Sequence, residues 1–156
     1  MVPLIKCLTL LSIFTIAASA GSFDEVKNRL GLREGRYRLL SGNNSACSDG
    51  PISLFEQDGQ LSLLVGAAIQ FHSIQLPHFE DKNSENICDY DTFTKVEKNR
   101  LSQKIIQKCA RSASLDQMTD QSLEIIPGNE VLFQSTVKGS DGKITQLRCK
   151  FMRSGA

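Results

Sequence analysis

Two runs of alternating apolar residues, separated by Asp58-Gly59, constrain the fold more than any other stretch of this chain. An Asp-Gly pair between such runs is a strong signal for a two-residue β-hairpin turn. With this turn, Ile52 lies opposite Val65 and Leu54 lies opposite Leu63. One face of the hairpin is then almost wholly aliphatic, and a shift by one residue would bring polar side chains onto it. The chain is therefore expected to form an antiparallel hairpin with one face that must be buried.

The first structured element is predicted to be a short helix from Ser22 to Gly31. Ser22 and Glu25 have the spacing of a capping box, and Gly31 stands where a helix C-cap is expected. A helix of about two turns is unstable alone, so its apolar side must pack against another element. We expect that element to be the end of a sheet.

The last third of the chain contains two more turn signals, Pro127-Gly128 and Ser140-Asp141-Gly142. Three-residue loops at both turns bring the apolar residues of the flanking strands onto one common face. Two-residue loops scatter the same residues over both faces. The agreement between two independent turns indicates a continuous antiparallel meander.

The predicted fold is all-β, an antiparallel up-and-down barrel of about eight to ten strands with a short N-terminal helix. A two-sheet sandwich is the alternative. A barrel is favoured because joining the first and last strands removes both exposed edges. Segments 41–50 and 77–89 are expected to be polar loops, and 111–120 a loop or short helix.

Residues 1–20 have the pattern of a signal peptide. Lys6 precedes an apolar stretch, and Ala18-Ser19-Ala20 has the small-x-small form of a cleavage site. The apolar stretch is shorter than the roughly 20 residues of a membrane-spanning helix, so no membrane anchor is expected. We predict an exported protein, periplasmic or extracellular, with a single domain at 21–156.

Loss of residues 1–20 leaves a neutral chain, because the 18 Lys and Arg fall to 17 and equal the 17 Asp and Glu. A neutral protein is a poor partner for nucleic acid, so none is expected. The sequence does not indicate an oligomeric state.

Four of the five cysteines lie after residue 20, an even number that indicates two disulfides in an exported chain. A two-residue turn at Lys98-Asn99 places Cys88 directly opposite Cys109. That pair falls at a non-hydrogen-bonded position, where side chains approach closely. Cys47 and Cys149 remain and are predicted to form the second bond.

Gly35-Arg36-Tyr37, at the start of the first predicted strand, resembles the Gly-x-Trp of the lipocalins and the wider calycin class, with Tyr in place of Trp. The short helix followed by a meander is similar to the same class. In that family a basic residue near the last strand packs over the aromatic residue, and Arg148 or Arg153 could take this place. The resemblance implies a barrel that carries a small apolar ligand in its mouth.

No catalytic or metal-binding motif stands out. The chain has no Gly-x-Ser-x-Gly, His-Glu-x-x-His or phosphate-binding Gly-rich loop. His72 and His78, followed by Glu80 and Asp81, come closest to a metal-ligand set, but the spacing matches no known zinc pattern. We therefore expect no enzyme activity, no cofactor and no metal.

The sequence supports two functions. The first is a non-catalytic carrier of a small apolar ligand, held in the barrel mouth. The expected ligand lining consists of the aliphatic and aromatic residues on the inner face of the hairpins: Ile52, Leu54, Leu61, Leu63, Val65, Val131, Phe133, Leu147 and Phe151. The alternative is a protein-binding module, such as a hydrolase inhibitor, that acts through loops 41–50 and 77–89.

Overall fold

The structure is a computed structural model that describes residues 22–82, 87–110 and 112–155. Within these residues, one α-helix is followed by ten β-strands, with a 3₁₀ turn, η1, between the seventh and eighth strands. The elements are α1 (Phe23–Leu30), β1 (Gly35–Gly42), β2 (Gly50–Gln57), β3 (Gln60–Val65), β4 (Ile69–Phe71), β5 (His78–Asp81), β6 (Cys88–Glu97), β7 (Arg100–Cys109), η1 (Ala113–Leu115), β8 (Gln117–Ile126), β9 (Glu130–Gly139) and β10 (Ile144–Arg153). The predicted signal peptide lies outside the described residues.

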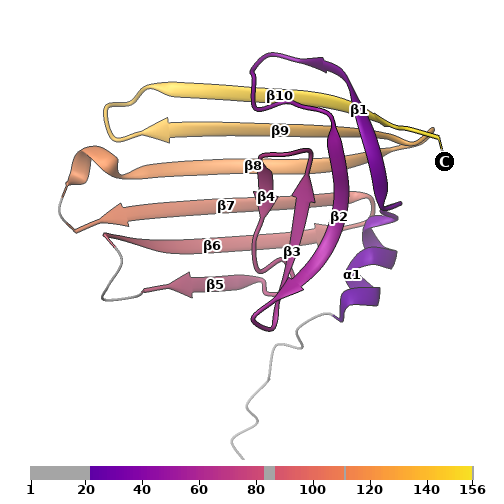
Figure 1. The fold of residues 1–156 in the computed structure, drawn as a ribbon. Coiled ribbons are helices and arrows are strands. Elements are labelled where there is room, and N and C mark those ends of the chain that lie inside the picture. The colour runs from indigo at the N-terminus through magenta and orange to yellow at the C-terminus, as the bar shows by residue number, and fades with distance from the viewer. Residues whose placement is uncertain (1–21, 83–86, 111, 156) are drawn as a thin grey trace, which may run out of the picture.

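All ten strands belong to one antiparallel sheet in the order β4-β3-β2-β1-β10-β9-β8-β7-β6-β5. Strands β6 to β10 are long, and the sheet curls so that β2, β3 and β4 cross one face of them (Figure 1). The prediction of an antiparallel up-and-down β fold with a short N-terminal helix is confirmed. Its architecture is compatible with the calycin class.

The sheet is a half-barrel, because no pairing joins its edge strands β4 and β5 within the described residues. The first and last strands were expected to be joined, and the structure corrects this point: the curled sheet stays open between β4 and β5. Both edge strands are very short, three residues in β4 and four in β5. Short edges offer few free backbone groups, so the edges can remain unjoined at small cost.

The predicted strand registers are confirmed. Ile52 pairs with Val65 and Leu54 with Leu63 around Asp58-Gly59, whose two residues both have positive φ, as a type I′ turn requires. At the later hairpins Leu123 pairs with Phe133, which in turn pairs with Cys149. These pairings place the apolar residues of β8, β9 and β10 on the inner face.

Two predicted loops contain strands. β5 lies within the segment 77–89, and β8 begins at Gln117, within 111–120. β5 has no apolar alternation, since its sequence is His-Phe-Glu-Asp, and it forms by pairing with β6. The tertiary environment therefore creates a strand that the local pattern does not indicate.

The predicted helix is confirmed in its bounds and its caps. The Ser22 side chain accepts a hydrogen bond from the Glu25 backbone N–H, and Gly31 adopts the left-handed conformation. Val26 and Leu30 are buried. The helix covers the end of the long strands near the turn between β6 and β7, where the Asn99 N–H donates to the Arg29 carbonyl at 3.2 Å. Among the described residues, no helix is long and apolar enough to cross a membrane.

Both predicted disulfides are present. Cys88 is bonded to Cys109 across β6 and β7, where the two are register partners. Cys47 is bonded to Cys149, which joins the segment after β1 to β10. Two disulfides are consistent with an oxidising, exported location.

The aromatic residue of the lipocalin-like tripeptide, Tyr37, lies directly opposite Arg153 on β10. The Tyr37 hydroxyl donates to the Arg33 carbonyl at 2.6 Å, and burial raises the pKa of this hydroxyl. A Cβ on Gly35 would lie 3.3 Å from Nε of Arg153, so glycine leaves room for the guanidinium. Of the two arginines, Arg153 is thus the one beside Tyr37, whereas Arg148 is exposed farther along β10.

Candidate functional site

The nine residues predicted to line a ligand cavity lie together in the packed core. Eight of them are buried, and Leu147 packs against the cluster. Phe133, for example, meets Phe71 of β4 edge to face, with ring centroids 5.9 Å apart. Their side chains form one hydrophobic cluster, and the two cavities described below are lined by other residues.

A cavity of about 640 Å³ lies on the concave face where the long strands extend beyond β2–β4. This volume falls within the usual range for small-molecule sites. Its lining comes from β3, the β4–β5 connection and strands β5 to β8: Gln60, His72, Ser73, Phe79, Asp81, Tyr90, Thr92, Ile105, Gln107, Gln117 and Thr119. We call it the concave cavity.

The floor of the concave cavity consists of two rows of side chains that run across β6, β7 and β8. Strand pairing places Ile105 between its neighbours Thr92 and Thr119, and it places Gln107 between Tyr90 and Gln117 in the next row. Alternate residues of a strand share one face, so both rows face the same space. The floor therefore combines apolar and aromatic surface with amide groups.

Hydrogen bonds fix the amides of the second row, which contains Gln107 and Gln117. Gln117 Nε2 donates to Gln107 Oε1 at 3.1 Å, and Gln107 Nε2 donates to the Leu115 carbonyl at 2.8 Å. Gln107 Nε2 also lies 3.3 Å from Sγ of Cys109, in the disulfide. The Cys88–Cys109 disulfide thus lies at this end of the cavity, where it joins the strands that carry Tyr90 and Gln107.

Two glutamines separate the concave cavity from the core. Gln103 Nε2 donates to the His72 carbonyl and, at 2.9 Å, to Oγ1 of Thr94. Gln121 Nε2 donates to the Gln70 carbonyl at 3.4 Å and to Oε1 of Gln103 at 3.2 Å. The Gln70 carbonyl belongs to edge strand β4 and the His72 carbonyl follows its last residue, so side chains of the opposite layer satisfy both. Gln103 is only 2% exposed.

His72 contributes an imidazole to the rim of the concave cavity. Desolvation by the surrounding chain lowers the pKa of this imidazole, which favours its neutral form. A neutral imidazole can both donate and accept a hydrogen bond. Beside it, the Ser73 hydroxyl is buried and donates to Oε1 of Gln60.

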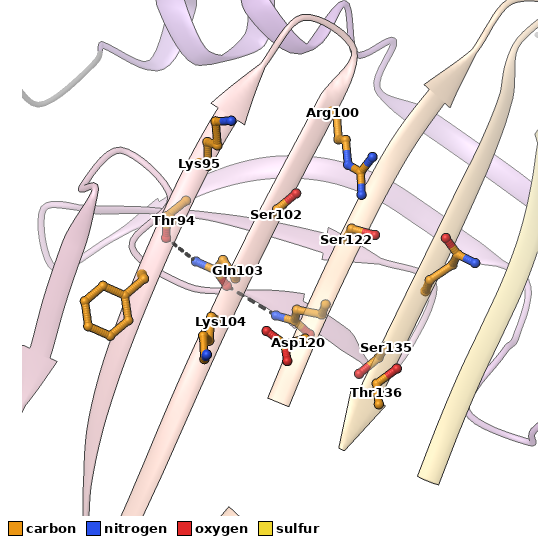
Figure 2. Close-up of a pocket in the computed structure, with 13 residues that line it drawn as sticks. Thr94, Lys95, Arg100, Ser102, Gln103, Lys104, Asp120, Ser122, Ser135 and Thr136 are labelled. Atoms are coloured by element: carbon orange, nitrogen blue, oxygen red, sulfur yellow. Dashed lines mark hydrogen bonds between the residues drawn. The ribbon is translucent and has the colours of Figure 1, made fainter. Parts of the chain in front are cut away.

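A second depression, of about 560 Å³, lies on the convex face of β6–β9. Figure 2 shows Ser102 between the longer side chains of Lys95, Arg100 and Lys104, with Ser122 on the neighbouring strand. Lys95 pairs with Glu97 at 2.6 Å. This surface is polar, charged and open to water, whereas small-molecule sites are concave and largely apolar. The concave cavity is therefore the better candidate.

The structure separates the four residues that came closest to a metal-ligand set in the sequence. His72 and Asp81 line the concave cavity. His78 and Glu80, which alternate with Phe79 and Asp81 along β5, face the convex side and meet Asp91 of β6 there.

Of the two predicted binding loops, 41–50 is tied to β10. The Asn43 N–H donates to the Arg148 carbonyl at 3.3 Å, and Asn43 Nδ2 donates to the Gln146 carbonyl at 3.1 Å. The other, 77–89, includes edge strand β5, and its residues 83–86 lie outside the described ranges.

No protein-family model matches this chain, and no curated protein matches it in sequence.

Proposed function

We propose that this protein is a non-catalytic, exported binding protein that holds a small amphiphilic molecule in the concave cavity. The observation that carries the proposal is the uncovered inner face of β6–β8, which forms a cavity of about 640 Å³. The signal-peptide pattern of residues 1–20 and the two disulfides support export. The lipocalin-like tripeptide with its opposing Arg153 supports a carrier role.

The lining of the cavity favours an amphiphile over a wholly apolar ligand. Phe79, Tyr90 and Ile105 offer apolar surface, and each 100 Å² of apolar ligand area removed from water contributes about 2.5 kcal/mol. The amides of Gln107 and Gln117 offer hydrogen bonds to a polar end group. A ligand with an acyl chain or aromatic ring and one polar end satisfies both parts of the lining.

A tryptophan reporter tests the proposal, because the natural chain contains none. Phe79→Trp places the indole at the concave cavity, and Phe93→Trp places a matched indole on the convex face of the neighbouring strand. Titration with decanoic acid or 1-naphthol should shift the emission of Phe79→Trp saturably and leave Phe93→Trp unchanged. The proposal fails if neither probe affects folded Phe79→Trp, or if only Phe93→Trp responds.

A further inference from the structure

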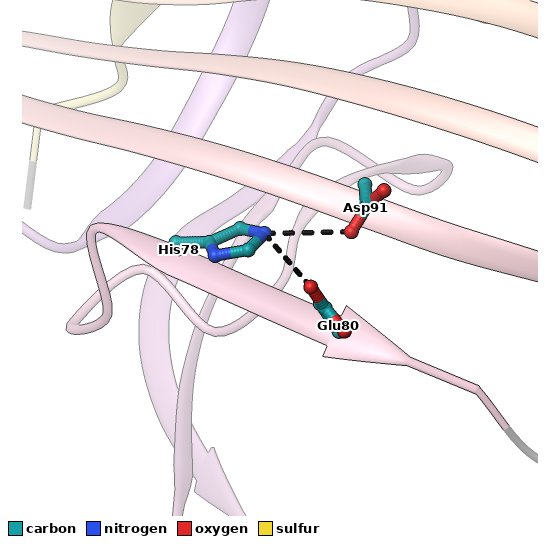
Figure 3. A group of neighbouring side chains, drawn as sticks. All are labelled: His78, Glu80 and Asp91. Carbon is teal, nitrogen blue, oxygen red and sulfur yellow. Dashed lines mark hydrogen bonds and ion pairs between the residues drawn. The ribbon is translucent and has the colours of Figure 1, made fainter.

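Three potential metal ligands converge on the convex face of the edge hairpin β5–β6, outside the concave cavity (Figure 3). Glu80 and Asp91 are direct cross-strand partners, and His78 lies two residues before Glu80 on the same face of β5. Nε2 of His78 is aimed at both carboxylates. Strand pairing thus assembles one imidazole and two carboxylates from residues that are separated in sequence.

The two distances from His78 are close to those of a tetrahedral metal centre. Nε2 of His78 lies 3.4 Å from Oδ1 of Asp91 and 3.8 Å from Oε1 of Glu80, and the three ligand atoms all lie within 4.8 Å of one another. Zinc bonds to nitrogen and oxygen of about 2.1 Å imply ligand atoms about 3.4 Å apart around a tetrahedron. The His78–Asp91 separation already has this value, and the His78–Glu80 separation exceeds it by about 0.4 Å.

The imidazole is held in place before any ion binds. The ring of His78 stacks on Phe93, its register partner, with centroids 4.6 Å apart and planes 7° from parallel. Stacking limits ring rotation, so a bound ion would cost little additional side-chain entropy. A further ligand position would face solvent, because β5 is an edge strand.

The local charge also favours a cation. Carboxylates placed directly opposite each other on neighbouring strands repel, as Glu80 and Asp91 do. Lys82 pairs with the other oxygen of Glu80, Oε2, at 2.6 Å, which leaves Oε1 toward the imidazole.

We propose that His78, Glu80 and Asp91 form a binding site for a divalent transition-metal ion of the zinc class. An imidazole nitrogen with two carboxylates suits such an ion, whereas calcium and magnesium prefer six or more oxygen ligands. The site lies on the opposite face of β5 from Phe79, so it is separate from the concave cavity and does not depend on the carrier function.

The test is a calorimetric titration of zinc chloride into the mature, untagged protein with its disulfides intact. One ion per chain is expected. His78→Phe retains a ring to stack on Phe93 but removes the nitrogen ligand, and it should weaken binding about tenfold or more. Asp91→Asn should have a similar effect. His72→Gln, which removes the other histidine of the chain, should leave the affinity unchanged.

The proposal is overturned if the folded natural protein takes up no zinc, or if His78→Phe and Asp91→Asn bind it as tightly as the natural protein. It is also overturned if His72→Gln alone loses binding. Calcium bound as tightly as zinc would show only a general acidic surface, and that result would refute a nitrogen-containing site. Circular dichroism of each variant establishes that the sheet remains folded.

Discussion

Removal of the two disulfides, one at a time, should destabilise the protein by different amounts. Cys47–Cys149 closes a loop of 102 residues, whereas Cys88–Cys109 closes one of 21. In the chain-entropy description these loops correspond to about 4.7 and about 3.3 kcal/mol of stabilisation at room temperature. The double variant Cys47→Ala/Cys149→Ala should therefore be less stable than Cys88→Ala/Cys109→Ala by about 1.4 kcal/mol.

Burial increases the expected difference. Cys149 is fully buried and Cys47 is 6% exposed, and both belong to the core cluster, so alanine at these positions also removes packed atoms. The assay is guanidinium chloride unfolding followed by far-ultraviolet circular dichroism, on both double variants and the natural protein. Equal stabilities, or a lower stability for Cys88→Ala/Cys109→Ala, would refute the argument from loop length.

Two further substitutions test the contacts that shape the half-barrel. Gln103→Leu removes the donor to the His72 carbonyl, so it should lower the free energy of unfolding by about 1–3 kcal/mol. The control Gln134→Leu, at an exposed position on the convex face, should change that free energy by less than about 0.5 kcal/mol. Equal losses of stability in the two variants would contradict the role of Gln103. The hydrogen bond from Lys27, with a further one from the Leu54 N–H, lowers the pKa of Glu34 in the folded protein. Glu34 should therefore stabilise the fold fully at pH values above its unfolded pKa of 4.5. It should lose this contribution as the pH falls through its lower folded pKa. Glu34→Gln should thus be about 1 kcal/mol less stable than the natural protein at pH 7 and approach it in acid, and a difference that does not change with pH would contradict the assignment.

The sequence predicted the fold well where local chemistry determines geometry. The Asp58-Gly59 turn determines the register of β2 and β3, and the turn at Lys98-Asn99 aligns Cys88 with Cys109. Each turn leaves one arrangement that buries apolar side chains, so pattern and turn agree. The short strand β5 was missed because it has no apolar alternation and forms by pairing with β6, and the meeting of His78 and Asp91 was missed with it.

The candidate cavity differs from the predicted lining for a physical reason. An aliphatic sheet face must be covered, and the face that includes Leu54 and Leu63 packs against the face that includes Phe133. The part of the inner face that remains open must tolerate water, so it carries polar and aromatic side chains such as Gln107 and Tyr90.

Gln103 and Gln121 could have been recognised from the sequence. Each lies two positions from a leucine on the same strand, Leu101 and Leu123, and therefore faces inward. An inward glutamine between apolar residues marks a place where backbone groups need a partner. The sequence does not indicate that they bind the carbonyls of Gln70 and His72. These carbonyls belong to β4 and the residue after it, and β4 is not a neighbour of β7 or β8 in the strand order.

Native mass spectrometry of the exported protein, purified from its own host without detergent, tests the carrier proposal most directly. Thr119→Trp fills the concave cavity, and Thr136→Trp places the same ring on the convex face. We expect the natural protein and Thr136→Trp to carry an additional small-molecule mass that organic solvent removes, and Thr119→Trp to lack it. Bare polypeptide mass for all three, or the same additional mass on Thr119→Trp, would contradict a ligand held in this cavity.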